Sequence, residues 1–146
     1  MAKNNRDEFT EKTKLLIAKR AGWLCSDPSC RRSTIGSNSD GDGEINLGTA
    51  AHICAAAREG PRYDPQMTRE QRRSPDNGIW MCRLHGTAVD AKDLKFTVEL
   101  LHEWKAQAQK DSWRRVLYND LPHGPAAQAP SEGELSARLR DRKSVV

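Results

Sequence analysis

The sequence predicts an α+β fold, in which short strands and helices form a small core held together by a metal ion. Three observations predict it. Apolar residues recur at helical spacing in several segments, two short apolar segments lie between turn residues, and cysteine and histidine residues stand in two close pairs. At 146 residues, 36% of them hydrophobic and 30% charged, the chain forms one small domain with a thin core. Small domains of this kind commonly depend on a metal ion or on disulfides for stability.

Helical patterns lie in three parts of the chain. Phe9, Leu15, Leu16, Ile17, Ala18 and Ala21 recur near helical spacing, which predicts a helix over residues 8–21. Residues 83–89 predict a short helix with Asp90 at its far end. Thr97 is a typical N-cap, and the apolar residues after it predict a longer helix over residues 98–118. We expect these helices to flank the strands and to act as scaffold.

Two apolar segments are predicted to be strands. The first covers residues 44–54 and carries His52 near its end, and the second covers Ile79, Trp80 and Met81 and ends at Cys82. Asn77–Gly78 precedes the second strand and is a strong signal for a tight hairpin turn. A lone histidine is more often packed or hydrogen-bonded than catalytic, so His52 gains interest only from what surrounds it.

The loops differ in charge. Residues 33–43 are polar, without an apolar period, and are predicted to connect two strands or to lie at the surface without a chemical role. Residues 58–71 are basic and contain a brief helical turn capped by Thr68. Arginine presents a planar fork of donors that suits phosphate, and a tyrosine can stack among such groups. The alternative is a solvated loop. The candidates for contact with a nucleic acid in and beside this loop are Arg58, Arg62, Tyr63 and Arg73.

The domain boundaries follow from composition. Residues 1–121 are predicted to form the domain, residues 122–133 a linker rich in proline, alanine and glycine, and residues 134–146 a charged tail or the start of a further domain. The formal charge of +4 and the pI of about 9.0 suit a polyanionic partner. The amino terminus lacks the apolar run of a secretory signal, and no segment is long and apolar enough to cross a membrane. We therefore expect a cytoplasmic protein without a membrane partner.

Four residues are predicted to bind zinc. Cys25 and Cys30 form one pair, and Cys82 and His85 form the other. These ligand types in two pairs, separated by four and by two residues, are typical of a tetrahedral structural zinc site. A zinc ion with four protein ligands has no open position, so it stabilises the fold and does not catalyse. The alternative for the first pair is two buried thiols. Cys54 is left over and is predicted to be a small buried apolar residue.

The order of these features resembles a known enzyme family. Ala51-His52-Ile53, then Gly60-Pro61-Arg62-Tyr63-Asp64, then residues 77–85 with the Cys-x-x-His pair, resemble the HNH endonucleases, whose fold is a β-hairpin and a helix around one metal ion (the ββα-metal motif). The resemblance covers residues 20–105 and is strongest to the nuclease half of the HNH–SAVED effectors of bacterial CBASS anti-phage defence. It implies hydrolysis of phosphodiester bonds in double-stranded DNA.

The resemblance also implies residue roles. His52 corresponds to the general base that takes a proton from water, and Asn77 to the residue whose side chain ties the loop so that the histidine points at the metal. Asp90 corresponds to a metal carboxylate, with Mg²⁺ as the expected catalytic ion beside the structural Zn²⁺. Two positions depart from the family pattern: Ala51 stands where Asp is frequent, and Gly86 stands where the third motif residue is usually His.

Three functions remain open from the sequence. The first is a metal-dependent DNA endonuclease, active as an oligomer and controlled by a cyclic-oligonucleotide sensor (SAVED) in cis or in trans. The second is a zinc-stabilised nucleic-acid-binding or assembly module whose catalytic site has decayed, which Ala51 and Gly86 suggest. The third is a structural zinc domain that associates through its long helix. His52 and Asp90 together favour the enzyme, because a decayed site has no reason to keep them.

Overall fold

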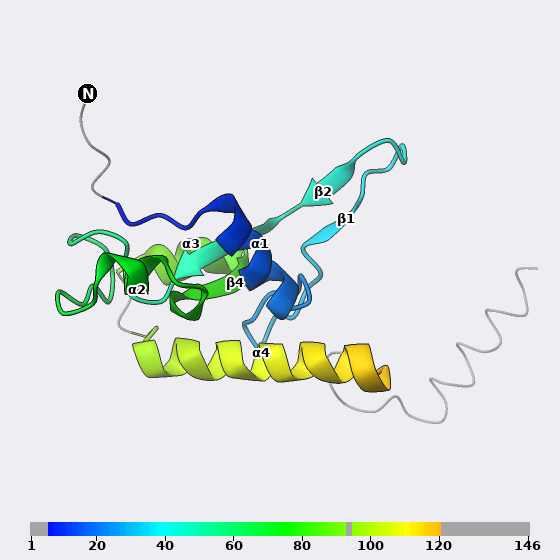
Figure 1. Ribbon diagram of the computed structural model, residues 1–146. Coiled ribbons are helices and arrows are strands. Elements are labelled where there is room, and N and C mark those ends of the chain that lie inside the picture. Colours follow the sequence, from blue (N-terminus) through cyan, green and yellow to red (C-terminus); the bar gives the residue numbers. More distant parts are fainter. Residues whose placement is uncertain (1–5, 93–94, 121–146) are drawn as a thin grey trace, which may run out of the picture.

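The computed structural model describes residues 6–92 and 95–120 (Figure 1). The predicted linker at 122–133 and the tail at 134–146 lie outside the described residues. Within the described part the chain is α+β, with two small antiparallel sheets and helices around them. In chain order the elements are α1 (Glu11–Arg20), β1 (Ile35–Ser37), β2 (Glu44–Asn46), β3 (Gly48–His52), α2 (Arg69–Arg73), the 3-10 helix η1 (Pro75–Asn77), β4 (Gly78–Cys82), α3 (Arg83–Asp90) and α4 (Val98–Tyr118).

The central sheet consists of β3 and β4. The strands are antiparallel, and their register runs from Gly48 opposite Cys82 to His52 opposite Gly78. Helix α3 packs on both strands, α1 also contacts both, and α4 lies along β4. Side chains alternate along β4, so Ile79 and Met81 enter the core shared with α3 and α4, while Trp80 packs with α1. This sheet positions His52, at the end of β3, and the metal-ligand candidate Cys82, at the end of β4.

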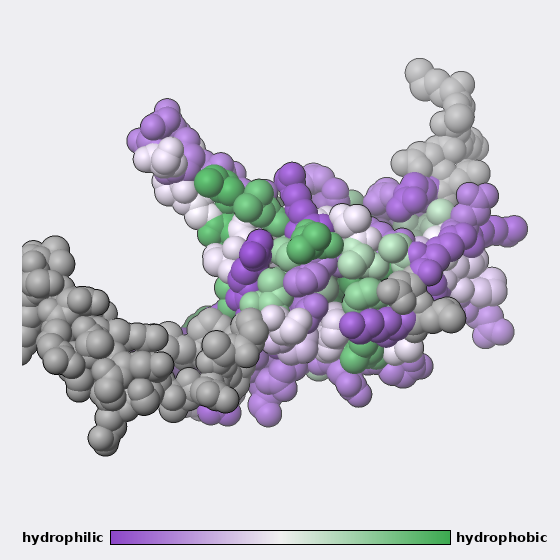
Figure 2. Space-filling view, turned by 180° about the vertical axis from the view of Figure 1, so that it is seen from behind, coloured by the Kyte–Doolittle hydropathy of each residue, from purple (hydrophilic) through white to green (hydrophobic). Residues whose placement is uncertain are grey.

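The second sheet is an arm formed by β1 and β2, which extends away from the other elements (Figure 1). Its tip is hydrophilic and its base more apolar (Figure 2). Asp40 and Asp42 lie in the turn, and the side chains of Ile45 and Leu47 are 44% and 50% exposed. The arm therefore adds little to the buried core.

The predicted strand at 44–54 is divided in two. Leu47 separates β2 from β3: its amide donates to the carbonyl of Thr34, and its carbonyl accepts from the amide of Arg83. The chain therefore passes from one sheet to the other at this residue. The loop predicted at 33–43 also supplies β1, because Ile35–Ser37 pairs with β2.

The predicted tight turn at Asn77–Gly78 is wrong. Gly78 is paired with His52, and the whole segment 53–77 connects the two strands. Asn77 closes the 3-10 helix η1, with its amide donating to the carbonyl of Ser74. The dipeptide signals a tight hairpin only when the strands on either side of it pair with each other, and here β4 pairs with a distant strand.

Helix starts follow their capping residues. The Thr97 hydroxyl accepts from the amide of Leu100, and α4 covers the predicted residues 98–118. Thr68 and Gln71 form a capping box at α2, as the predicted helical turn requires. Helix α1 begins later than predicted, because Thr10 is its N-cap and accepts from the amide of Thr13. Phe9 therefore lies outside the helix. No helix in the described part of the chain is long and apolar enough to cross a bilayer.

Candidate metal centre and candidate active site

Four side chains converge in a cluster suited to a metal ion. The ligand atoms of Cys25, Cys30, Cys82 and His85 all lie within 4.8 Å of one another. Cys25 and Cys30 come from the loop after α1. Cys82 ends β4 and is the N-cap of α3, with its Sγ accepting from the amide of His85 at 3.4 Å. His85 lies in the first turn of α3, and its ring reaches Cys25 of the first pair.

The distances fit a tetrahedral zinc ion. His85 Nδ1 lies 3.6 Å from the Sγ of Cys25 and 3.3 Å from the Sγ of Cys82. Zinc bonds of about 2.3 Å to sulfur and about 2.0–2.1 Å to nitrogen put such atoms about 3.6 Å apart across a tetrahedron. Burial raises the pKa of the Cys25 thiol to about 12, whereas a bound cation deprotonates a thiol ligand. The predicted cluster could therefore hold a metal ion such as zinc.

The loop that carries the first cysteine pair is fixed to α4. Arg31 follows Cys30 directly, and its guanidinium lies 3.5 Å from the carboxylate of Asp111, with both side chains almost fully buried. Within the loop, one carboxylate oxygen of Asp27 accepts from the amide and the hydroxyl of Ser29. Cys54 is buried elsewhere, as predicted, and it is not part of the cluster.

His52 is held by the chain segment before α1. Its ring stacks on Phe9, and its Nε2 lies 3.0 Å from the main-chain carbonyl of Asp7. A carbonyl can only accept a hydrogen bond, so Nε2 carries the hydrogen and Nδ1 is the basic nitrogen of the neutral ring. Burial lowers the pKa of His52, and the hydrogen bond to Asp7 and the nearby Glu8 carboxylate partly oppose this. The ring is therefore neutral near pH 7 and able to accept a proton.

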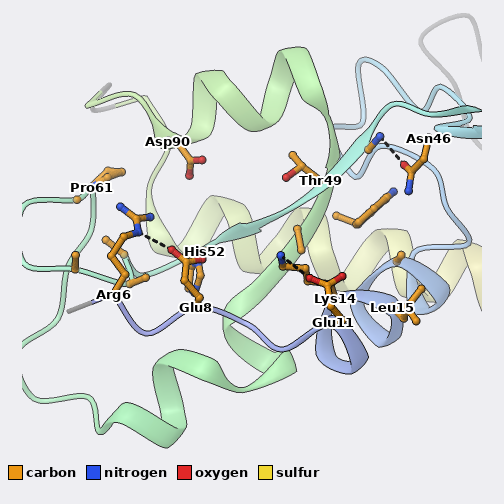
Figure 3. Close-up of a pocket in the computed structure, with 18 of the residues that line it drawn as sticks. Arg6, Glu8, Glu11, Lys14, Leu15, Asn46, Thr49, His52, Pro61 and Asp90 are labelled. Carbon is orange, nitrogen blue, oxygen red and sulfur yellow. Dashed lines mark hydrogen bonds and ion pairs between the residues drawn. The ribbon is translucent and has the colours of Figure 1, made fainter. Parts of the chain in front are cut away.

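His52 and Asp90 line one cavity of about 640 Å³ (Figure 3). Asp90 reaches it from the C-terminal end of α3, and Arg6 and Glu8 reach it from the segment before α1. Burial raises the pKa of Asp90, while the positive charges of Arg62 and Arg6 lower it. Two residues that are far apart in sequence, a neutral histidine and a carboxyl group, thus open into the same space.

Asn77 ties the segment after β3 to the end of η1. Its Oδ1 accepts from the amide of Cys54 at 2.9 Å, and its Nδ2 donates to the carbonyls of Cys54 and Arg72 at 2.9 and 3.0 Å. Its own carbonyl accepts from the amide of Ile53. The side chain is buried, so these hydrogen bonds are shielded from water.

Arg62 differs from its predicted role as a phosphate contact. Its guanidinium donates to the main-chain carbonyls of His52, Ile53 and Val89, with a longer contact to that of Phe96. Its backbone is in the left-handed region, at φ +57°, where only a residue fixed by its surroundings persists. These carbonyls engage the donors that a phosphate needs. Arg62 instead joins the end of β3 to the end of α3.

Two of the other predicted contacts with a nucleic acid, Arg58 and Tyr63, line a second hollow of about 600 Å³, which Arg72 also lines. Arg58 is exposed. Tyr63 packs under the Arg72 guanidinium, 4.6 Å from ring centroid to carbon. Arg73 donates from Nε to the carbonyl of Glu8, which leaves its terminal NH₂ groups for other partners. This hollow shares Arg6 with the cavity at His52, so the two adjoin.

The two departures from the family pattern have structural counterparts. Ala51 is 3% exposed and packs in the core opposite Ile79, so it does not face the cavity. Gly86 lies against β3: a Cβ atom there would come within 2.4 Å of a methyl carbon of Thr49. Any side chain at position 86 would therefore have to push the two elements apart.

The sequence alone does not indicate a role at the site for the segment from Arg6 to Phe9. This segment supplies the stacking ring and the carbonyl that fix His52, and Glu8 adds a carboxylate to the cavity, where Arg6 pairs with it. The helix predicted over residues 8–21 includes Glu8 and Phe9, which the structure places before α1. Thr10 was the available signal, because a threonine before the first helical turn is a typical N-cap and leaves the residues before it free for other contacts.

No protein-family model matches the chain, and no curated protein matches it. The function has to be argued from the site itself and from the sequence motifs.

Proposed function

We propose that this protein is a metal-dependent HNH endonuclease that hydrolyses phosphodiester bonds in DNA. The observation that carries the proposal is the cavity shared by His52 and Asp90. In support, β3, β4 and α3 pack together as one strand–strand–helix unit, with His52 at the end of its first strand and Asp90 at the end of its helix. This is the order of the ββα-metal motif that the sequence resembles.

His52 supplies the base. Its Nε2–H is held by the Asp7 carbonyl, so Nδ1 accepts the proton of the water that attacks the phosphorus atom. The bond from phosphorus to the 3′-oxygen then breaks. The neutral state of the His52 ring near pH 7 suits this role, because a protonated ring cannot accept a further proton.

Asp90 and Glu8 bring carboxylates to the same end of the cavity. Mg²⁺ in proteins is held by one or two carboxylates together with water and substrate oxygens, so these residues fit such an ion. When bound, Mg²⁺ stabilises the charge that develops on the phosphate and on the leaving oxygen.

Zinc at the four-ligand cluster is proposed to stabilise the fold. The cluster joins the loop after α1 to the start of α3, the helix that carries Asp90. We further propose that the nuclease is part of a bacterial anti-phage defence effector, which a cyclic-oligonucleotide sensor of the SAVED type, in cis or in trans, assembles into an active oligomer. The sequence resemblance supports this part of the proposal.

A second candidate function is a zinc-stabilised nucleic-acid-binding or assembly module without catalysis. The close packing of Gly86 on Thr49 favours it, because a side chain has no space at the position of the usual third motif residue. The buried Ala51 favours it too. Both candidates share the zinc cluster and the second hollow, which Arg58 lines. A DNA cleavage assay therefore distinguishes them.

The experiment is DNA cleavage with matched variants. Purified protein is incubated with plasmid and with linear DNA, with and without Mg²⁺. His52→Ala should reduce cleavage about a hundred- to ten-thousand-fold while zinc content and DNA affinity stay unchanged. Asp90→Asn should also abolish cleavage, with partial recovery at high Mg²⁺, whereas excess Mg²⁺ should not restore His52→Ala. His102→Ala, at an exposed position of α4, is the control and should cut at the parental rate. Binding without cleavage by the parental protein, under all these conditions, would favour the second candidate.

A further inference from the structure

The cavity at His52 has a second end with a different character. His52, Asp90, Arg6 and Glu8 gather at one end, and Glu11, Lys14, Leu15 and Asn46 lie at the other (Figure 3). We name the second end the Trp23 subsite and define it by Leu15, Ala18, Trp23, Asn46, Gly48 and Ala50. Its residues come from α1, from the turn after α1, from the end of β2 and from the first half of β3.

The Trp23 subsite is apolar and aromatic, with a polar edge. Leu15 lines it and is 48% exposed, although α1 buries other apolar residues fully. Gly48 lets the Trp80 ring pack directly against β3, because a Cβ atom there would come within 2.1 Å of that ring. At the rim, Asn46 accepts from the amide of Gly48 through Oδ1, and its NH₂ group keeps two donors for other partners. An apolar lining with a few directed polar groups is typical of a ligand-binding site.

Trp23 is held in a costly backbone conformation. Its φ of +62° lies in the left-handed region, which is unfavourable for a bulky side chain by about 1–3 kcal/mol. The surroundings fix it there: its amide donates to the carbonyl of Ala18, and its carbonyl accepts from the amide and the hydroxyl of Thr34. The indole stands perpendicular to Trp80, with ring centroids 5.5 Å apart. Backbone strain of this kind is concentrated at functional sites.

The charge and the spacing of the cavity point to the ligand. Basic residues (Arg6, Lys14 and Lys92) and acidic ones (Glu8, Glu11, Glu59 and Asp90) are mixed along it, so it is a poor cradle for the two phosphate backbones of a duplex. Gly48 and His52 are four residues apart on β3, about 13 Å at the usual rise of a strand. This distance corresponds to the length of a few nucleotides, because one strand of a duplex rises about 3.4 Å per nucleotide.

From these features we infer that the Trp23 subsite binds an unpaired nucleobase, which stacks against the Trp23 indole and accepts hydrogen bonds from the Asn46 amide. The inference rests on the proposed function and deepens it: the substrate is a single strand, or a locally unpaired stretch, that follows β3 from the Trp23 subsite to His52. Aromatic side chains bind bases of any sequence in this way, because every base has a flat face.

The test measures binding without cleavage. In a His52→Ala background, a short single-stranded oligodeoxynucleotide carries the fluorescent base 2-aminopurine at one position, which is moved along the strand. Stacking in the Trp23 subsite should quench the fluorescence at one position. Trp23→Ala should remove the quenching and weaken binding about 5- to 150-fold, the loss expected for one base–aromatic stack, whereas Trp23→Phe should retain most of both. Trp113→Ala, at an exposed position of α4, is the control and should bind as the parent does.

A second measurement needs no change at Trp23. Oligonucleotides with one abasic site, moved along the strand, compete for the protein, and one position should bind about as weakly as the Trp23→Ala variant binds the intact strand. Equal affinity at all positions, or equal affinity for single strand and duplex without quenching, overturns the inference. If the parental protein cleaves DNA but the Trp23 variants bind the strand as the parent does, the subsite is overturned and the nuclease proposal stands. Binding that depends on Trp23, without cleavage by the parental protein, overturns the nuclease proposal and leaves the subsite standing.

Discussion

The phenyl ring of Phe9 lies flat against the imidazole of His52, with ring centroids 3.8 Å apart and ring planes 5° from parallel. This stack and the Asp7 carbonyl hold the ring from two directions. Phe9→Leu keeps an apolar side chain of similar size and removes the stack. It should lower the single-turnover rate of DNA cleavage about 2- to 10-fold at a small cost in stability, and Phe9→Tyr should not. A parental rate for Phe9→Leu would show that the stack does not position the base.

The protonation of His52 should depend on its burial. Burial lowers the pKa of His52 from 6.5, so the ring stays neutral below pH 6.5 and cleavage should persist there until the ring is protonated. The unfolded chain binds the proton first as pH falls. The stability contributed by the neutral ring is therefore complete above pH 6.5 and is lost as pH falls through the pKa of the folded state. NMR titration of the ring, assigned by its absence in His52→Ala, measures this pKa. A pKa at or above 6.5 would contradict the prediction.

Asn77 should be critical for stability. Asn77→Ala leaves the amide and carbonyl of Cys54 and the carbonyl of Arg72 without these partners in a buried place. Unsatisfied buried groups of this kind should cost about 2–5 kcal/mol in the free energy of unfolding. Urea unfolding of the metal-loaded protein measures the loss. Asp76→Ala, at the exposed neighbouring position, should stay within about 0.5 kcal/mol of the parent.

Arg62 and Arg58 should respond differently to the same change. Arg62→Ala removes donors from the carbonyls of His52 and Val89 and should lower stability by about 2–4 kcal/mol. It should leave the salt dependence of DNA binding unchanged. It should also raise the pKa of Asp90, because the Arg62 charge lowers it. Arg58 is exposed, and if it contacts a phosphate, Arg58→Ala should make the slope of log affinity against log salt shallower by about 0.9. A shallower slope for Arg62→Ala would restore its predicted role.

Substitution of Cys82 should have a much larger effect than substitution of Cys54. Both thiols are buried, but Cys82 alone of the two belongs to the four-residue cluster. Cys82→Ala should lose the metal ion and unfold the domain, because small metal-dependent folds are commonly unfolded without their ion. Cys54→Ala should bind one zinc ion per chain and remain folded. Native mass spectrometry and circular dichroism measure the two properties. A folded Cys82→Ala variant would show that the metal cluster is not needed to hold the fold together.

The helices and the metal cluster were predictable because their signals are local. Thr97 and the apolar spacing after it define α4, and the ligand pairs at Cys25 and Cys82 are recognisable by residue type and separation. Nothing in the sequence near Leu47 indicates that its amide and carbonyl bond to different parts of the chain. Strand pairing is decided by distant partners, so a single apolar segment can be shared by two sheets.

The candidate site was predictable at His52 and Asp90 only through a sequence resemblance, and their shared cavity emerges from the fold. The role of Arg62 could not be predicted, because an arginine in a basic loop looks the same whether its partners are phosphates or carbonyls. Physically, the difference lies in the left-handed backbone at this residue and in its burial, and neither has a reliable signature in one sequence.

The long connection 53–77 between β3 and β4 bears on how the chain reaches its fold. The two strands cannot pair outward from a tight turn. The chain must first close a large loop, and this loss of conformational entropy comes before the hydrogen bonds between the strands can offset it. The cysteine pair at Cys25 and Cys30 and the pair at Cys82 and His85 lie on either side of this connection and of the arm. An ion that captures both pairs brings the remote ends together in one step. We therefore expect the supply of metal to set the refolding rate of this chain.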